Sequence, residues 1–162
     1  DVVSSSWQSI LESSIGKYRI GVDIFPSQQI TGFLLQQLIS LEIVKRHPND
    51  WRGEKTAHDK DLVNLSNEIF SVEIKTSSHP SGIFGNRSYA QKSSKQKKKK
   101  SGYYLTINNQ AIQKIPNPEI LKIRFGWVDH IDWIGQKAAT GQQASLSPDV
   151  LNFKLITLFS RQ

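Results

Sequence analysis

Residues 61–75 read DLVNLSNEIFSVEIK, and this stretch decides the expected fold. From Phe70 to Lys75 apolar and polar residues alternate, which predicts a strand with Glu73 and Lys75 on the face opposite the apolar side chains. A β-prone run over 62–65 precedes it, and the polar break at 66–68 has the length of a hairpin turn. The stretch therefore predicts a β-hairpin that carries charged side chains on one face.

A turn centred on Asn67 would pair Asp61 with Glu73. Directly opposed residues of an antiparallel pair have Cβ atoms about 4.5 to 5.5 Å apart, so the two carboxylates would repel each other unless a cation lay between them. Mg²⁺ suits such a pair, because it takes one or two protein carboxylates and completes its shell with water and phosphate oxygens. Lys75 would then stabilise charge on the phosphate or help to deprotonate the attacking water.

The hairpin thus predicts the catalytic residues Asp61, Glu73 and Lys75 of a metal-dependent phosphodiesterase, with Asp61 and Glu73 as metal ligands. The alternative interpretation is an amphipathic hairpin whose acidic and basic groups are solvated surface charges.

The positive charge of the chain is concentrated in one segment. The formal net charge is +7, and residues 87–100 contain seven basic side chains and no acidic one. Such a local excess is typical of a polyanion-binding surface. We expect DNA contacts, through charge, hydrogen bonds or stacking, from Asn86, Arg87, Tyr89, Gln91, Lys92, Lys95, Lys97, Lys98, Lys99 and Lys100. A solvated lysine loop or a localisation patch is the alternative.

Composition limits the class of protein. With 162 residues and 37% hydrophobic content, the chain has the size of one ordinary domain. The absence of cysteine excludes disulfides, thiolate zinc sites and cysteine nucleophiles. No run of 18 apolar residues and no signal peptide pattern is present, so we expect no membrane segment and a cytoplasmic location.

Two helices are expected before the hairpin. One follows the serines at 4–6 and stops at Gly16, and a longer one begins at the N-cap Ser27 and ends near His47. The longer helix has an apolar repeat that predicts a buried stripe of Ile30, Leu34, Leu38 and Leu41. Glu42 borders this stripe, so it is either an accessory acid of the site or a surface partner of Lys45 or Arg46.

Further strands are expected over 102–108 and 121–128. Together with the hairpin they predict one sheet covered by the long helix, which is an α/β or α+β layered domain. We expect a single nuclease domain over 1–162, with a helical part at about 4–47, a catalytic sheet at about 60–128 and a C-terminal part at 129–162.

Two polar clusters follow the sheet. Asp129, His130 and Asp132 could bind a metal, although no helical histidine spacing supports a dedicated zinc site. Gln136, Gln142 and Gln143 could read adenine edges, or they could simply be solvated.

Asp61, eleven intervening residues and then Glu73-Ile74-Lys75 resemble the motif of the PD-(D/E)xK nuclease superfamily. The series Lys60-Asp61-Leu62, Glu73-Ile74-Lys75-Thr76-Ser77-Ser78, Phe84-Gly85-Asn86-Arg87-Ser88-Tyr89, Ser101-Gly102-Tyr103-Tyr104-Leu105 and Ile123-Arg124-Phe125-Gly126-Trp127 is similar to ScaI-like type II restriction endonucleases. This resemblance spans about residues 50–145. One departure is Lys60, where the superfamily usually has proline before the aspartate.

The resemblance implies a restriction-endonuclease-like mixed sheet flanked by helices. It also implies Mg²⁺-dependent hydrolysis of double-stranded DNA at a specific sequence, with Mn²⁺ as a possible substitute and usually with a homodimer. By position, Asp61 and Glu73 would hold the metal and Lys75 would orient or activate water, whereas Glu42 matches the helix acid of some members only loosely. The alternatives are a junction-resolving, repair or homing nuclease of the same fold, and a DNA-binding module without catalysis.

Overall fold

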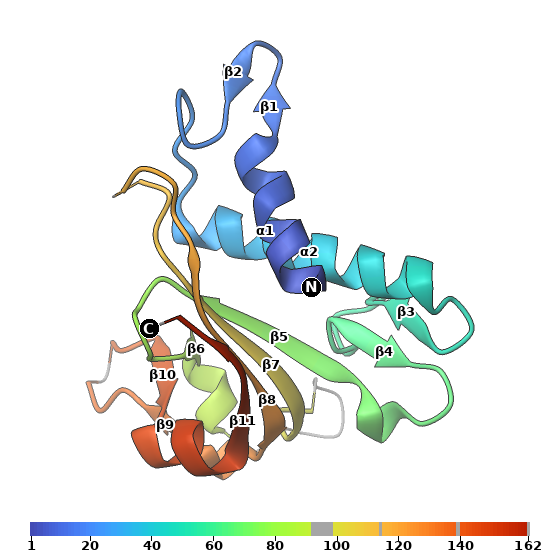
Figure 1. Ribbon diagram of the computed structural model, residues 1–162. Helices are drawn as coiled ribbons and strands as arrows, with labels where there is room; N and C mark the ends of the chain where they lie inside the picture. Colours follow the sequence, from blue (N-terminus) through green and yellow to red (C-terminus); the bar gives the residue numbers. More distant parts are fainter. Residues whose placement is uncertain (92–98, 114, 139, 162) are drawn as a thin grey trace.

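A mixed six-stranded sheet forms the centre of the computed structural model, which describes residues 1–91, 99–113, 115–138 and 140–161 (Figure 1). The strand order is β11-β8-β7-β5-β4-β3, and only the β5–β7 pair is parallel among these neighbours. The strands are β3 (Trp51–Gly53), β4 (Leu62–Asn64), β5 (Val72–Ser77), β7 (Gly102–Asn109), β8 (Ile120–Val128) and β11 (Leu155–Ser160). The mixed α+β fold expected from the sequence is confirmed.

Two helices cover one face of this sheet, α1 (Val2–Glu12) and α2 (Gln28–Arg46) (Figure 1). Their buried side chains Trp7, Leu35 and Ile39 pack with Ile74 of β5 and Ile107 of β7 in one hydrophobic core. A short hairpin of β1 (Ser14–Ile15) and β2 (Tyr18–Arg19) follows α1. No helix in the described ranges is long and apolar enough to cross a membrane.

The opposite face is covered by a three-stranded sheet and short helical turns. This sheet has the order β6-β10-β9, with β6 (Phe84–Asn86), β9 (Trp133–Gly135) and β10 (Gln143–Leu146). The turns are η2 (Arg87–Ala90), η3 (His130–Asp132) and the π-helical turn η4 (Val150–Lys154), whereas η1 (Glu68–Phe70) connects β4 to β5. A second core joins Tyr104 and Val128 to Trp133, Leu146 and Leu151. The central strand β5 is therefore enclosed on both sides.

The register of the β4–β5 hairpin agrees with the expectation. Leu62 pairs with Val72, so the hairpin is centred on Asn67 and the next pair outward sets Asp61 opposite Glu73. The connection is a 3₁₀ turn, and the Asn67 side chain caps it by accepting a hydrogen bond from the Ile69 backbone N–H (3.0 Å). Phe70 was expected in the strand but lies in this turn, half exposed.

The limits of α2 were predicted correctly, since Ser27 is its N-cap and His47 its C-cap. The predicted stripe of Ile30, Leu34, Leu38 and Leu41 was wrong: Ile30 and Leu41 are exposed, Leu34 and Leu38 are only partly buried, and the fully covered side chains are Thr31, Leu35 and Ile39. The predicted stripe fails because α2 packs closely on β5 at Gly32, where an added Cβ would lie 2.3 Å from Thr76 Oγ1. Small residues therefore face the sheet. The buried stripe of α2 is shifted by one residue from the predicted stripe, to Thr31, Leu35 and Ile39.

We expect Gly32→Val to lower the free energy of unfolding by about 2 kcal/mol, because the added side chain overlaps Thr76 and forces α2 from β5. Urea unfolding measures this loss. Thr76→Ala in the same chain should recover part of it. The control is Gly53→Val, since a Cβ at Gly53 meets no atom within 4 Å; equal losses at both glycines would contradict the packing argument.

Candidate active site

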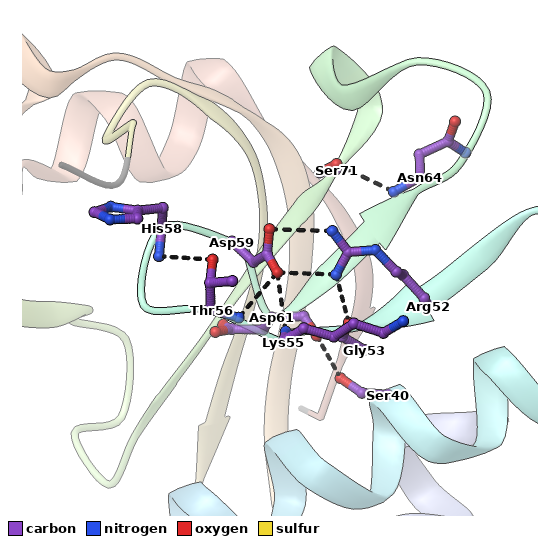
Figure 2. A network of polar contacts seen from close by, with 10 residues as sticks. All are labelled: Ser40, Arg52, Gly53, Lys55, Thr56, His58, Asp59, Asp61, Asn64 and Ser71. Carbon is purple, nitrogen blue, oxygen red and sulfur yellow. Dashed lines mark hydrogen bonds and ion pairs between the residues drawn. The ribbon is translucent and has the colours of Figure 1, made fainter. Parts of the chain in front are cut away.

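Asp61 directly precedes β4 and is held by contacts to two other elements. Its carboxylate Oδ2 accepts a hydrogen bond from the Ile74 backbone N–H at 2.6 Å, and its carbonyl oxygen accepts one from Ser40 Oγ of α2 at 3.1 Å. Figure 2 shows Asp61 above Ser40, at the point where the β3–β4 loop enters the sheet. The side chain is buried, with the residue only 4% exposed. The backbone of β5 thus positions the carboxylate of its neighbour strand.

Glu73 lies on the face of β5 that is directed toward Tyr104, its register partner on β7. Its carboxylate Oε1 accepts hydrogen bonds from Lys75 Nζ at 2.7 Å and from the Tyr89 hydroxyl at 2.5 Å. Glu73 is 1% exposed, and Lys75 retains 18% exposure of its side chain. The structure therefore contradicts the alternative of a hairpin with solvated charges.

The charges of this site depend on one another. Burial opposes the charge of Lys75, but Glu73 and then Asp61 outweigh it, so the pKa of Lys75 is raised. Burial, together with the nearby Glu73 and Asp61, raises the pKa of Tyr89. At neutral pH the site thus contains a protonated lysine and a neutral tyrosine that donates to Glu73. Asp61 and Glu73 each raise the pKa of Lys75 and that of Tyr89, so the four side chains interact electrostatically.

The loop that leads from β3 into Asp61 is held by an ion pair. Arg52 donates from Nη1 and Nη2 to the two oxygens of Asp59, at 2.9 and 3.1 Å (Figure 2). Asp59 Oδ2 also accepts hydrogen bonds from the backbone N–H groups of Lys55 and Thr56. The hydrogen bond from Arg52 holds the pKa of Asp59 well below its usual value, against the effect of burial. This network fixes the loop two residues before Asp61.

Lys75 faces two adjoining hollows of about 450 and 440 Å³. The first lies toward β6 and β10, and its lining includes Asn86, Gln142 and Gln143; the second lies toward the start of α2, with Gln28, Gln29 and Gln36. Asn86 and Gln29 border both. Amide side chains, which donate and accept hydrogen bonds, thus surround the exposed part of Lys75.

A third hollow of about 540 Å³ lies at the start of β7. Its lining includes three lysines and two imidazoles, together with two carboxylates, namely Lys60, Lys99, Lys100, His58, His130, Asp59 and Glu68. Lys100 also places its Nζ 4.1 Å from the ring centre of Tyr89. One lysine of this hollow, Lys100, therefore also contacts the tyrosine that donates to Glu73.

The expected DNA-contact residues have different surroundings. Asn86 and Gln91 are exposed, whereas Tyr89 is 8% exposed and turns its hydroxyl toward Glu73. Arg87 donates to the carbonyl oxygens of Ala138 and Gly141, so it supports the β9–β10 loop. Lys99 Nζ lies 4.0 Å from Glu68 Oε2. Lys92, Lys95, Lys97 and Lys98 lie outside the described residues.

Two other groups of candidate residues form structural contacts. Glu42 pairs with Arg46 on α2 at 3.6 Å, with 40% of its side chain exposed, as in the surface arrangement considered above. Asp129 and Asp132 cap η3, and both pair with Lys154. Within the described residues, no group of three or more His, Cys, Asp or Glu side chains is arranged to hold a metal ion.

Tyr89 is the site residue whose role the sequence did not reveal. It follows Glu73 by sixteen residues, and the contact depends on β6 and η2 crossing back over β5. No periodicity links residues that meet through such a crossover. A tyrosine between a strand and a lysine run was therefore interpreted as a DNA contact.

Comparison with known proteins identifies the family of this chain. A family model described as "ScaI restriction endonuclease" matches residues 1–159. The type II restriction enzyme ScaI of Streptomyces caespitosus is 44% identical over 162 residues, which cover 98% of this chain and 71% of that enzyme. No solved structure matches significantly.

The class of protein is thus an endonuclease of the restriction type. More narrowly, the chain belongs to the ScaI restriction endonuclease family.

We expect Asp59→Asn to lower the free energy of unfolding by about 1–2 kcal/mol at pH 7, because Arg52 loses its charged bidentate partner. The pKa of Asp59 is lowered on folding, so its contribution is complete above the ordinary value of 3.8 and is lost as the pH falls below it. Urea unfolding at pH 7, 4 and 3 should show the difference shrinking. Glu119→Gln, at an exposed ion pair with Arg161, is the control; a difference independent of pH would contradict the assignment.

Proposed function

We propose that this chain is a Mg²⁺-dependent, sequence-specific endodeoxyribonuclease that hydrolyses phosphodiester bonds of double-stranded DNA. The observation that carries the proposal is the burial of Asp61 and Glu73 on adjacent strands, with Lys75 in hydrogen-bond contact with Glu73. Membership in a restriction endonuclease family supports it. The three residues match the PD-(D/E)xK pattern in type, order and strand position.

The donor set fits Mg²⁺. Two buried carboxylates supply hard oxygen ligands, and Mg²⁺ commonly binds one or two carboxylates while water and phosphate oxygens complete its shell. A structural zinc site would need four nitrogen or sulfur ligands, which this site does not offer. Asp61 and Glu73 would hold the ion, and the bound ion would stabilise charge on the phosphate and lower the pKa of its water.

Lys75 would contribute a positive charge beside Glu73. Its raised pKa keeps the ammonium group protonated at neutral pH, so it donates hydrogen bonds and attracts the phosphate. Its partly exposed end faces the hollows, where a phosphate oxygen would come within reach. Lys75 would thus orient the scissile phosphate and stabilise the charge that develops on it.

We further propose how the protein contacts DNA. The basic hollow that includes Lys60, Lys99 and Lys100 suits backbone phosphates, which position a duplex without reading its sequence. The amides around Lys75, among them Asn86 and Gln143, suit base edges, since Asn and Gln pair with adenine through two hydrogen bonds. Arg87 would act indirectly, by holding the loop that carries the glutamines.

A homodimer would allow both strands of one site to be cut. A symmetric duplex site presents the same phosphate geometry on each strand, so a two-fold pair of subunits places one catalytic site on each. Sedimentation of a complex with a single-site duplex in Ca²⁺ measures the number of copies bound. One copy per site would contradict this part of the proposal.

Digestion of a mapped plasmid, followed by sequencing of the ends, tests the function. We expect discrete fragments with Mg²⁺ or Mn²⁺, and none after addition of EDTA. Preference for branched DNA over plain duplex would favour the junction-resolving alternative. Binding without cleavage in either metal would favour a non-catalytic module.

We expect Lys75→Ala to reduce the cleavage rate by about 10²-fold or more, because the developing phosphate charge loses its cation. Single-turnover cleavage measures the rate, and binding to the same duplex in Ca²⁺ should change by less than about threefold. Glu119→Gln is the matched control, because this surface residue pairs with Arg161. A Lys75→Ala enzyme that cuts at the normal rate would refute the assignment.

Replacement of Lys97 and Lys98 by glutamine should weaken binding to all duplexes and make it less dependent on salt. If each lysine neutralises one phosphate, the slope of log affinity against log salt should decrease by about one to two. Fluorescence anisotropy in Ca²⁺ measures this slope. The control replaces Lys17 and Lys45, which lie outside the basic segment, and an equal change in both pairs would count against a localised DNA surface.

A further inference from the structure

Tyr89 is the feature of the site that the proposed reaction leaves without a role. Its hydroxyl is 2.5 Å from Glu73 Oε1, a short distance typical of a hydrogen bond to a charged carboxylate. Lys75 Nζ donates to the same oxygen at 2.7 Å. One oxygen of the proposed metal ligand thus accepts hydrogen bonds from two side chains.

The position of Tyr89 is determined by its neighbours. Its ring packs against Trp133, with ring centres 5.0 Å apart, and a Cβ on Gly85 would lie 3.1 Å from Tyr89 Cδ2. The ammonium groups of Lys75 and Lys100 lie 4.9 and 4.1 Å from the ring centre. Packing and cation–π contacts therefore hold the ring and aim the hydroxyl at Glu73.

Tyr89 also lies where the two ends of the basic segment meet. The residue belongs to η2, at the start of the segment, and Lys100 at the other end contacts the same ring. The backbone carbonyl of Lys100 accepts a hydrogen bond from the Tyr104 hydroxyl at 2.6 Å. The start of the segment is thus held at Glu73 by the Tyr89 hydroxyl. Its end is held by the hydroxyl of Tyr104, the register partner of Glu73.

We propose that Tyr89 is a positioning residue that orients the Glu73 carboxylate for metal binding. Because Oε1 accepts from Tyr89 and Lys75, the orientation of the Glu73 carboxylate is fixed for an ion that it would share with Asp61. A carboxylate ligand without its hydrogen-bond partner rotates more freely, and loss of such a partner typically weakens metal affinity or activity about 10- to 100-fold. The inference rests on the proposed metal site, and it gives Tyr89 no contact with DNA.

The test is Tyr89→Phe, which keeps the ring and its packing and removes only the hydroxyl. Mn²⁺ binding in the absence of DNA, measured by electron paramagnetic resonance of the free ion, should weaken about tenfold or more. Steady-state cleavage should show a kcat lowered by about tenfold at saturating DNA and fixed Mg²⁺. The KM for DNA should change by less than about twofold.

Tyr104→Phe is the matched control. It removes another buried hydroxyl from the same face, but one that donates to a backbone carbonyl rather than to Glu73. Urea unfolding should give similar stability losses for both variants, whereas Mn²⁺ affinity should fall only in Tyr89→Phe. Equal Mn²⁺ affinities in Tyr89→Phe and the wild type would overturn the inference, as would a rise in KM alone, which indicates a DNA contact.

Failure of the proposed function has a separate signature. If the wild-type protein cuts DNA but does not bind Mn²⁺ at the concentrations that support cleavage, then the metal site assigned to Asp61 and Glu73 is wrong, and the role of Tyr89 is refuted with it. If the wild type binds Mn²⁺ and Tyr89→Phe does not differ, only the inference about Tyr89 is refuted.

Discussion

The burial of two carboxylates beside each other is the constraint on which the site depends. Asp61 and Glu73 are both almost fully covered, and like charges in a poorly solvated place repel strongly. The protein compensates with a backbone N–H at Asp61 and with Lys75 and Tyr89 at Glu73. These donors stabilise the buried negative charges, and a divalent cation would complete the site. Charge compensation and proposed catalysis therefore use the same side chains.

The sequence predicted the local parts of the structure. The predictions of the hairpin register, of the N-cap at Ser27 and of Glu73 and Lys75 on one face of a strand all depend on residues close together in the chain. Alternation and turn residues are informative at that range. The closeness of Asp61 and Glu73 followed from the register alone. The family assignment also followed from short motifs and was confirmed by comparison with known proteins.

The parts that the sequence did not predict depend on tertiary packing. The buried stripe of α2 is rotated because Gly32 fits against Thr76, and an apolar repeat does not reveal which small residue allows a close approach. Tyr89 was expected at the surface because a crossover, rather than strand periodicity, brings it to Glu73. The glutamines around Lys75 come from α2 and β10, which lie far apart in the chain.

The parallel pairing of β5 and β7 has a consequence for folding order. Parallel neighbours need a crossover, and here residues 78–101 form it and carry Tyr89. The β4–β5 hairpin closes contacts only ten to thirteen residues apart, whereas the crossover closes a longer loop and is expected to follow it. A chain that is still folding therefore brings its two carboxylates together before Tyr89 can orient one of them. If Tyr89 orients Glu73 as proposed, the metal site would be complete only when the crossover has docked.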